Sequence, residues 1–275
     1  MTEVQPYSLG ATEPELARLD AQAASIARPT DLFLRSAGIA PGMRVLDLGT
    51  GLGHVAFRVS ELVGSAGAVV GIDQAAAMLA VAEQRRAAAG VENVTFVEAD
   101  VRAFRDREAF DAVVGRLILF HLPDAAVVLQ HHVGGLTADG LMLMIDFDVG
   151  SVRSEPSVPL FDAARDWVIK AFRQAGANPI IGTQLGLLLR DAGLTDIETF
   201  GMQSYLTPDD PAGPALLSGV VTSLAPVILA GRIATEEEIG LDTFQERLAR
   251  ELQTSRAIGL IPAVAGAWGR RRAQA

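Results

Sequence analysis

The residues from Asp47 to Gly53 place one carboxylate and three glycines in a single turn. The sequence reads Asp-Leu-Gly-Thr-Gly-Leu-Gly, so Gly49, Gly51 and Gly53 occupy every second position. A short apolar run ending at Leu48 precedes the turn, and apolar residues at helical spacing follow it. This order predicts a ligand site, because glycine lets a ligand approach bare backbone and a helix N-terminus offers unpaired N–H groups.

The spacing and charge of this turn separate two classes of cofactor. A dinucleotide turn has the pattern G-x-G-x-x-G, and counted from Gly49 its third glycine would fall on His54. Asp47 would also repel a pyrophosphate at close range, whereas it would attract an ammonium group. S-adenosylmethionine carries an ammonium group and a sulfonium and has no phosphate. The turn therefore favours S-adenosylmethionine over a nicotinamide dinucleotide.

Further aspartates lie near the ends of the later apolar runs, which are the predicted strands. Because ligands of a parallel sheet bind outside the carboxyl ends of its strands, we expect Asp47, Asp73, Asp100 and Asp146 at one edge. Asp73 can accept hydrogen bonds from ribose hydroxyls, and Asp100 from the exocyclic amine of adenine, beside the backbone of Val101. The alternative is that these residues only cap helices or strand-end turns.

Apolar runs alternate with helical patterns through most of the chain. Since the runs are continuously apolar, they predict an α/β fold with a doubly wound, mostly parallel sheet that is covered on both faces. We expect strands at 45–48, 68–73, 94–98, 110–115 and 141–148, a strand near 197–205 and a last strand at 257–268, with helices after Gly53 and at 75–89, 123–133, 159–175 and 182–192.

The predicted elements divide the chain into three parts. Residues 1–40 form an N-terminal helical extension that starts with a capping box at Thr12–Glu15. Residues 41–207 and 256–270 form the cofactor-binding Rossmann-like domain, and 208–255 form a helical lid insertion. Within the insertion, the apolar segment 214–231 is expected to be a buried or lid helix pair, because it contains Pro226 and lacks a flanking belt of a membrane span.

Composition limits the partners of this chain. It has 275 residues, 49% of them hydrophobic, with a net charge of -10 and no cysteine. So acidic a surface disfavours nucleic acid, and the lack of cysteine excludes disulfides and thiolate metal sites. The N-terminus lacks the pattern of a signal peptide, which predicts a cytoplasmic protein. We expect a small-molecule substrate, no nucleic-acid or membrane partner, and a homodimer as one option.

These motifs together resemble the class I S-adenosylmethionine-dependent methyltransferases. The similarity covers most of the chain, at 45–53, 70–73, 96–100, 110–123 and 140–148. The start, Tyr7-Ser8-Leu9-Gly10, and the end, Ala267-Trp268-Gly269-Arg270, resemble an actinobacterial-type branch that acts on small molecules. The resemblance implies a Rossmann-like sheet of seven strands whose last strand runs antiparallel.

The resemblance also implies which residues bind S-adenosylmethionine. Tyr7 would close over the cofactor, and Arg116 would lie beside its methionine part. No metal is expected, because no Asp/Asn trio of catechol type is present. The full predicted cofactor set is Tyr7, Asp47, Gly49, Thr50, Gly51, Gly53, Asp73, Gln74, Met78, Asp100, Val101 and Arg116.

His121 is the candidate general base, because it follows the fourth predicted strand. A base is needed only if the acceptor arrives protonated, and the alternative for His121 is a packing role. We expect His131 and His132 on a helix surface. The aromatic residues Phe161, Trp167 and Phe172 line an acceptor pocket or, at their helical spacing, belong to the core.

The predicted function is methyl transfer from S-adenosylmethionine to a small, largely apolar molecule, in a setting such as natural-product biosynthesis. The acceptor atom can be O, N or C. One alternative keeps the fold and the cofactor but catalyses a cyclisation or rearrangement without methylation. A nicotinamide oxidoreductase is disfavoured by Asp47 and His54, and a non-enzymatic binding protein by the retained glycines and carboxylates.

Overall fold

The computed structural model describes residues 12–272, so the predicted role of Tyr7 lies outside the described residues. The chain divides into two compact units. The first comprises Met1–Asp146, Gln184–Phe200 and Gly266–Ala275, and the second comprises Phe147–Thr183 and Gly201–Ala265. The three-part division into an extension, a Rossmann-like domain and a lid stays a prediction.

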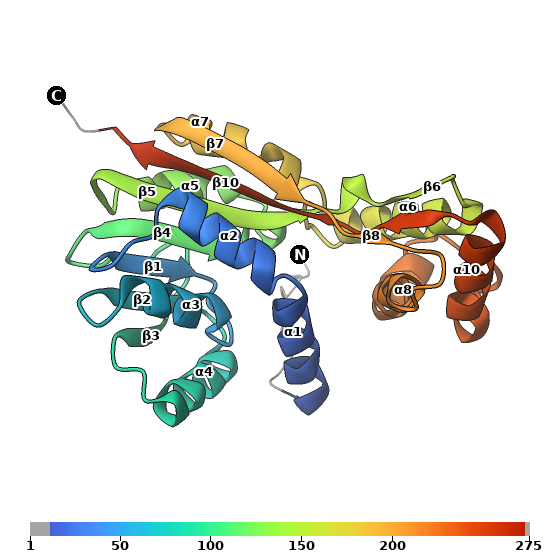
Figure 1. The fold of residues 1–275 in the computed structure, drawn as a ribbon, viewed down its shortest axis with the longest axis horizontal. Helices are drawn as coiled ribbons and strands as arrows, with labels where there is room; N and C mark the ends of the chain where they lie inside the picture. The colour runs from blue at the N-terminus through green and yellow to red at the C-terminus, as the bar shows by residue number, and fades with distance from the viewer. Residues whose placement is uncertain (1–11, 273–275) are drawn as a thin grey trace. The chain divides into compact units, whose positions relative to one another are not determined.

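A seven-stranded sheet forms the centre of the first unit, in the order β3-β2-β1-β4-β5-β10-β7 (Figure 1). The neighbours from β3 to β5 pair in parallel, and the arrowheads of β10 and β7 point in opposite directions. The predicted Rossmann-like, doubly wound sheet of seven strands is confirmed. The strands are β1 Arg44–Leu48, β2 Ala68–Asp73, β3 Val94–Glu98, β4 Phe110–Arg116, β5 Leu136–Asp148, β7 Leu194–Met202 and β10 Ala263–Arg271.

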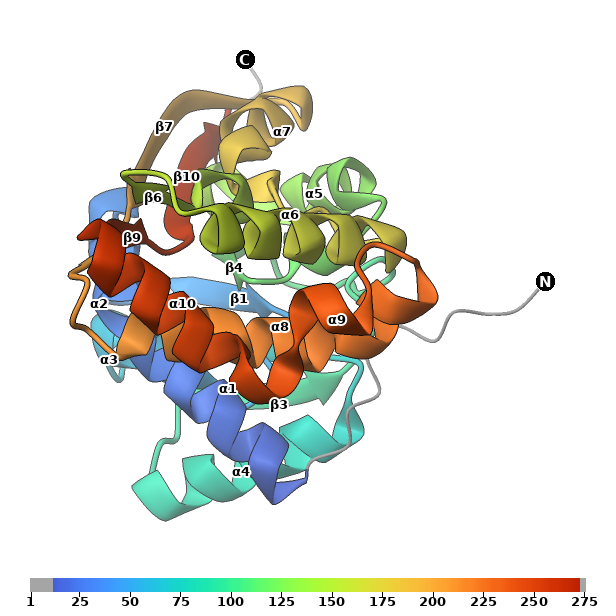
Figure 2. The same ribbon diagram turned by 90° about the vertical axis from the view of Figure 1, so that its right-hand side faces the viewer.

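Helices cover both faces of this sheet, which explains why its strands are apolar without alternation. Helices α2 and α3 lie on one side of the sheet, and α5 and α7 on the other (Figure 2). In β1, Val45 and Leu48 are fully buried. The helices of this unit are α1 Glu13–Ser25, α2 Ala27–Ala37, α3 His54–Val63, α4 Ala76–Ala89, α5 Ala125–Val133 and α7 Leu185–Asp191.

The second unit packs α8 against both α6 and α10. Phe161 is buried there, and Trp167 packs against Phe244 with ring centroids 6.3 Å apart, so both contribute to the core of this unit. Its helices are α6 Pro159–Gln174, α8 Ala212–Ala230, α9 Glu236–Ile239 and α10 Leu241–Ser255. A small sheet has the order β6-β9-β8, with β6 Arg153–Glu155, β8 Tyr205–Leu206 and β9 Ile258–Leu260.

Helix α8 differs from the helix pair predicted for 214–231. It is one continuous helix with Pro226 inside it. Its length and composition are those of a membrane span, and 39% of its most apolar window is buried. The buried set, which includes Leu217, Val221 and Ile228, recurs at helical spacing. The apolar residues of α8 therefore contribute to the packing of the second unit.

Several predicted element ends were wrong. The side chain of Thr12 makes no capping hydrogen bond to the first turn of α1 within the described residues, and the side chain of Glu15 pairs with Arg18 at 2.7 Å. A capping box does form at α9, between Thr235 and Glu238. The predicted last strand is two strands, β9 and β10, and β5 begins at Leu136 rather than at 141. Apart from the missing capping box, each error concerns where an element starts or stops, not its type.

Candidate functional site

The glycine turn joins β1 to α3 at the carboxyl edge of the sheet. Gly49 has φ 65°, and a Cβ there would lie 2.7 Å from Cδ1 of Ile118, so a side chain does not fit. Gly51 has φ 51°, and no atom of the described residues lies within 4 Å of its Cβ position. Gly53 completes the turn and precedes the first residue of α3. The backbone at Gly51 is therefore open to a ligand on one side.

Asp47 lies beneath the turn, and only 1% of its surface is exposed. Its Oδ2 accepts a hydrogen bond from the Thr50 hydroxyl at 2.6 Å. Burial raises the pKa of Asp47 to about 7, against the opposing effects of the Thr50 hydrogen bond and the positive charge of Arg116. The structure therefore gives Asp47 and Thr50 a role in shaping the turn. Their contact with the cofactor stays a prediction.

Asp73 connects the end of β2 to the glycine turn. Its Oδ2 accepts from the backbone N–H of Gly51 and its Oδ1 from that of Ala75, both at 2.9 Å. Asp73 is only half-buried, and each carboxylate oxygen can accept a second hydrogen bond. The predicted neighbours differ in exposure, because Gln74 is exposed and Met78 is buried on α4. Asp73 can thus hold the turn and still accept from ribose hydroxyls.

Asp100 lies at the same edge, two residues beyond β3. The register between β2 and β3 pairs Asp73 with Glu98, so Asp100 follows directly on the neighbouring strand. The carboxylate of Asp100 is exposed, and its Oδ1 accepts from the N–H of Arg102 at 2.8 Å. Val101 beside it is buried. The predicted ribose and adenine residues are therefore neighbours in the sheet.

Arg116 ends β4 on the other side of β1, where the register pairs Gly115 with Leu48. Its Nη1 donates to the Thr30 hydroxyl at 3.1 Å. Burial lowers the pKa of Arg116 to about 10, although the negative charge of Asp47 favours its charged form. Arg116 therefore stays positively charged at neutral pH.

His121 lies in a short 3-10 helix, Leu119–His121, that follows β4. Asp146 organises this loop, because its buried Oδ2 accepts from the N–H of Phe120 at 3.0 Å. The side chain of His121 reaches solvent, yet desolvation by its surroundings and the positive charge of Arg18 lower its pKa. The imidazole is neutral at pH 7 and able to accept a proton. Asp146 supports the loop that carries it.

The structure adds a cluster that sequence reasoning missed. Asp20 of α1 contacts Nε2 of His54 at 2.7 Å and both terminal nitrogens of Arg85 at 2.9 Å. The cluster joins α1, α3 and α4 beside the glycine turn. Because Asp20 lies 34 and 65 residues from its partners, no local sequence pattern indicates the contact.

His132 corrects a second expectation. It was predicted on a helix surface, but only 3% of it is exposed and its Nε2 lies 2.7 Å from the carbonyl oxygen of Val101. Burial lowers the pKa of His132 to about 4. His131 contacts the carbonyl oxygen of Phe104 at 2.8 Å. Both histidines thus hold the loop that follows Asp100.

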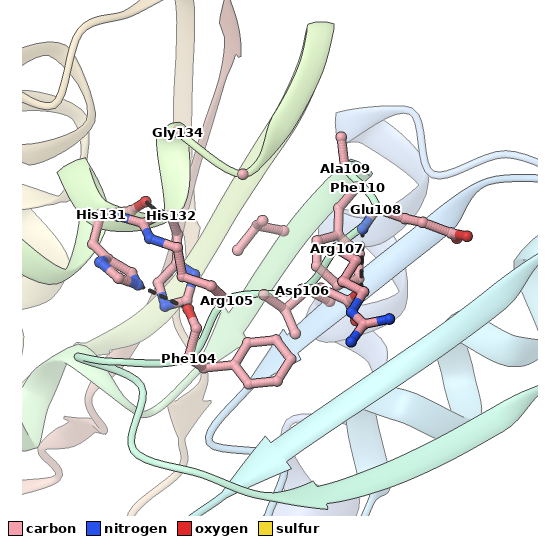
Figure 3. A pocket seen from close by; sticks show the side chains of 13 residues that line it. Phe104, Arg105, Asp106, Arg107, Glu108, Ala109, Phe110, His131, His132 and Gly134 are labelled. Carbon is pink, nitrogen blue, oxygen red and sulfur yellow. Dashed lines mark hydrogen bonds between the residues drawn. The ribbon is translucent and has the colours of Figure 1, made fainter.

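Both histidines line a cavity, which has a volume of about 200 Å³ (Figure 3). Its lining includes the residues from Phe104 to Phe110 and the end of α5. Because β4 begins at Phe110 and ends at Arg116, this cavity lies toward the opposite edge of the sheet from the glycine turn. Within residues 12–272, no three His, Cys, Asp or Glu side chains are grouped to hold a metal ion.

Comparison with known proteins supports a methyltransferase. A family model described as a methyltransferase domain matches residues 39–178, just over half of the chain. The ubiquinone/menaquinone biosynthesis C-methyltransferase UbiE of Agrobacterium fabrum is 32% identical over 139 residues, which cover 50% of this chain and 51% of that protein. The aklanonic acid methyltransferase DauC of a Streptomyces species is 37% identical over 101 residues, 36% of this chain and 46% of that protein.

A solved structure shares the fold over nearly the whole chain. The YcgJ protein of Bacillus subtilis has a TM-score of 0.61 and 18% sequence identity, and the match covers 90% of this chain and 100% of that one. The chain spans about half the length of the first curated relatives that it matches. The matched segment, residues 39–178, contains the glycine turn, Asp73, Asp100 and Arg116. The chain belongs to the methyltransferase-domain family, and its sheet is that of the class I S-adenosylmethionine-dependent methyltransferases.

Proposed function

We propose that this protein transfers a methyl group from S-adenosylmethionine to a small, largely apolar molecule. The observation that carries the proposal is the charge of the sheet edge beside the open backbone of Gly51. Asp47, Asp73 and Asp100 bring three carboxylates to this edge; Arg116 lies on its β4 side, and the guanidinium of Arg102 lies 3.5 Å from Oδ1 of Asp100. Such an edge repels a pyrophosphate and attracts a cationic cofactor.

The described residues fit the parts of S-adenosylmethionine. Asp73 has lone pairs left for the ribose hydroxyls, and we propose that Asp100 with the Val101 backbone binds adenine. The glycine turn leaves room for the methionine part near Arg116. Bound S-adenosylmethionine supplies a methyl group on an already activated leaving group, so the protein mainly aligns the acceptor and excludes water.

His121 is the proposed general base for an acceptor that arrives protonated. Its lowered pKa keeps the imidazole neutral at pH 7, which is the form that accepts a proton. The hydrogen bond from Phe120 to Asp146 fixes the loop that presents it. The proposed role of His121 is to take the proton of the acceptor as the methyl group is transferred.

The nature of the acceptor is supported by the relatives. Their names refer to ubiquinone and menaquinone biosynthesis and to aklanonic acid. We infer an acceptor of similar size and apolar character for this chain, as in natural-product biosynthesis, with O, N or C as the methylated atom. A cytoplasmic location completes the proposal, with a homodimer as one option, and neither nucleic acid nor membrane is part of it.

Calorimetric titration with S-adenosylmethionine, S-adenosylhomocysteine and NAD tests the cofactor. We expect binding of the first two and none of NAD. Asp73→Ala should weaken binding of S-adenosylhomocysteine by about tenfold to a hundredfold, as expected for loss of hydrogen bonds to a charged group. Glu98→Ala is the matched control, since Glu98 is an exposed carboxylate on the adjoining strand. Binding of NAD alone would refute the proposal.

A labelled methyl donor then separates methylation from a cyclisation or rearrangement that only needs the bound cofactor. With S-adenosylmethionine labelled at its methyl group, we expect the label in an apolar acceptor from a panel that includes demethylmenaquinone and aklanonic acid, the compounds named for two relatives. The position of the label in the product identifies the acceptor atom as O, N or C. A converted acceptor without label would replace methyl transfer by the cofactor-dependent rearrangement.

A further inference from the structure

The loop after β3 is fastened along the whole of α5. At the start of the helix, Arg102 donates to both carboxylate oxygens of Asp124, at 2.8 and 3.0 Å. At the end of the helix, Arg105 donates to the carbonyl oxygen of His131 at 3.1 Å. Because the two anchor points on α5 are seven residues apart, about 10 Å along a helix, the loop is held over its length and not at one point.

The two histidines at the end of α5 complete this attachment. Nε2 of His132 lies 2.7 Å from the carbonyl oxygen of Val101, and Nε2 of His131 lies 2.8 Å from that of Phe104. A carbonyl oxygen only accepts, so both rings donate from Nε2. Figure 3 shows His131 turned toward Phe104, with His132 beside it. His132 is buried, where a carbonyl without a donor is costly.

The residue that His132 holds is the neighbour of Asp100. The carbonyl oxygen of Asp100 accepts from the N–H groups of Ala103 and Phe104, at 3.0 and 2.9 Å, and its Oδ1 accepts from that of Arg102. Residues 100–104 therefore form one tight turn. A donor at the carbonyl of Val101 fixes the Val101–Arg102 peptide, whose N–H donates to Oδ1 of Asp100, and thereby the direction of the Asp100 carboxylate.

We propose that His132, assisted by His131, is a positioning residue that sets the adenine specificity of the cofactor site. The two rings hold the turn of residues 100–104 so that the Asp100 carboxylate and the Val101 backbone face the base. This inference rests on the proposed binding of S-adenosylmethionine. The histidines themselves act through the turn and do not touch the cofactor.

The consequence is discrimination at the exocyclic group of the base. The Asp100 carboxylate only accepts, so it favours the amine of adenine and repels the oxo group of hypoxanthine. A hydrogen bond of this kind to a charged group corresponds to a preference of about tenfold to a hundredfold. Without the donor of His132 the turn can shift, and the preference should shrink even where overall affinity survives.

The test is the ratio of two dissociation constants, for S-inosylhomocysteine and for S-adenosylhomocysteine, measured by calorimetry on the same preparation. A reduced folded fraction affects both ligands alike and leaves the ratio unchanged. In the unaltered protein we expect a ratio of about ten or more, and in His132→Leu less than about three. His132→Gln, whose amide can still donate, should restore most of the ratio.

Leu129→Ala is the control for a general loss of stability. Leu129 is fully buried on the same helix, so its truncation should lower the melting temperature while the ratio stays that of the unaltered protein. An unchanged ratio in His132→Leu, or equal ratios in the Gln and Leu variants, would overturn the inference. A ratio near one in the unaltered protein would overturn it too, with cofactor binding intact. Failure to bind either ligand would instead refute the proposed function, and the inference with it.

Discussion

Asp47 makes the stability of the first unit depend on pH in a direction unusual for a carboxylate. Its pKa is about 7 in the folded protein, whereas an aspartate in an unfolded chain titrates near 4. Between these values the folded state holds one more proton than the unfolded state. The free energy of unfolding therefore falls as pH rises, by about 1.4 kcal/mol per pH unit. Over the whole interval the loss is about 4 kcal/mol.

His132 changes the free energy of unfolding in the opposite direction over part of the same pH range. Burial lowers its pKa to about 4, from an ordinary value near 6.5, so the unfolded state holds the extra proton there. Stability from His132 rises with pH by a similar slope and is complete above pH 6.5. The two slopes nearly cancel below pH 6.5, and the fall caused by Asp47 becomes visible only between about pH 6.5 and 8.

Asp47→Asn isolates the effect of the carboxylate. Asparagine keeps the size of the side chain and an oxygen for the Thr50 hydroxyl, and it does not titrate. The difference in unfolding free energy, variant minus unaltered protein, should rise by about 2.5 kcal/mol from pH 5 to pH 8, because the carboxylate of Asp47 titrates over only about two pH units of that interval. Urea denaturation followed by the fluorescence of Trp268 measures it, in a Trp167→Phe background that leaves one of the two tryptophans.

A control and a contrary result define this experiment. Glu98→Gln removes an exposed carboxylate from a neighbouring strand and is measured under the same conditions as the control. If the difference for Asp47→Asn changes no more than that for Glu98→Gln from pH 5 to pH 8, the carboxylate of Asp47 titrates at its ordinary pKa. The argument that Asp47 is desolvated beneath the turn would then be wrong.

Two further substitutions address catalysis and assembly of the site. His121→Ala should reduce turnover by about a hundredfold or more while the affinity for S-adenosylhomocysteine stays within about twofold, if it is a general base; an unaltered rate at saturating acceptor would return His121 to packing. Asp20→Ala leaves His54 and Arg85 without their shared carboxylate, and it should lower stability by about 1 kcal/mol, because Asp20 is partly exposed. Asp31→Ala, which removes the surface ion pair with Arg58, is its control. If the loss of unfolding free energy in Asp20→Ala is no larger in low salt than in high salt, the electrostatic explanation is contradicted.

The fold could be predicted because its signals are local. Five apolar runs separated by helical periods indicate a parallel sheet wherever both faces are covered. The errors arose where two local signals compete. Pro226 suggested a break, yet α8 continues through it, and the register shift near Phe110 lets β5 extend back to Leu136. Packing of α8 against α6 and α10 outweighs the cost of the proline, and the hydrophobic periodicity of the sequence does not indicate this packing.

For the site, the sequence predicts only which residues lie at the same carboxyl edge of the sheet. Strand ends identified the four carboxylates, since residue order fixes where each strand stops. Their roles depend on burial, which the sequence does not carry. Asp47 and Asp146 are 1% exposed and organise turns, whereas Asp73 and Asp100 reach the surface of the edge. The contacts of Asp20 and His132 join segments distant in sequence, so periodicity could not indicate them.

Binding of a cation to this edge must change the titration of Asp47. With a pKa of about 7, the carboxylate is half protonated at pH 7 before any ligand arrives. An ammonium group nearby favours the charged form, so binding of S-adenosylhomocysteine should release up to about half a proton per site at pH 7. Calorimetry in two buffers of different ionisation enthalpy measures this release, and Asp47→Asn corrects for protons exchanged elsewhere. Equal release by the variant would mean that the ligand's charge does not reach Asp47, and that the turn binds the cofactor through its backbone alone.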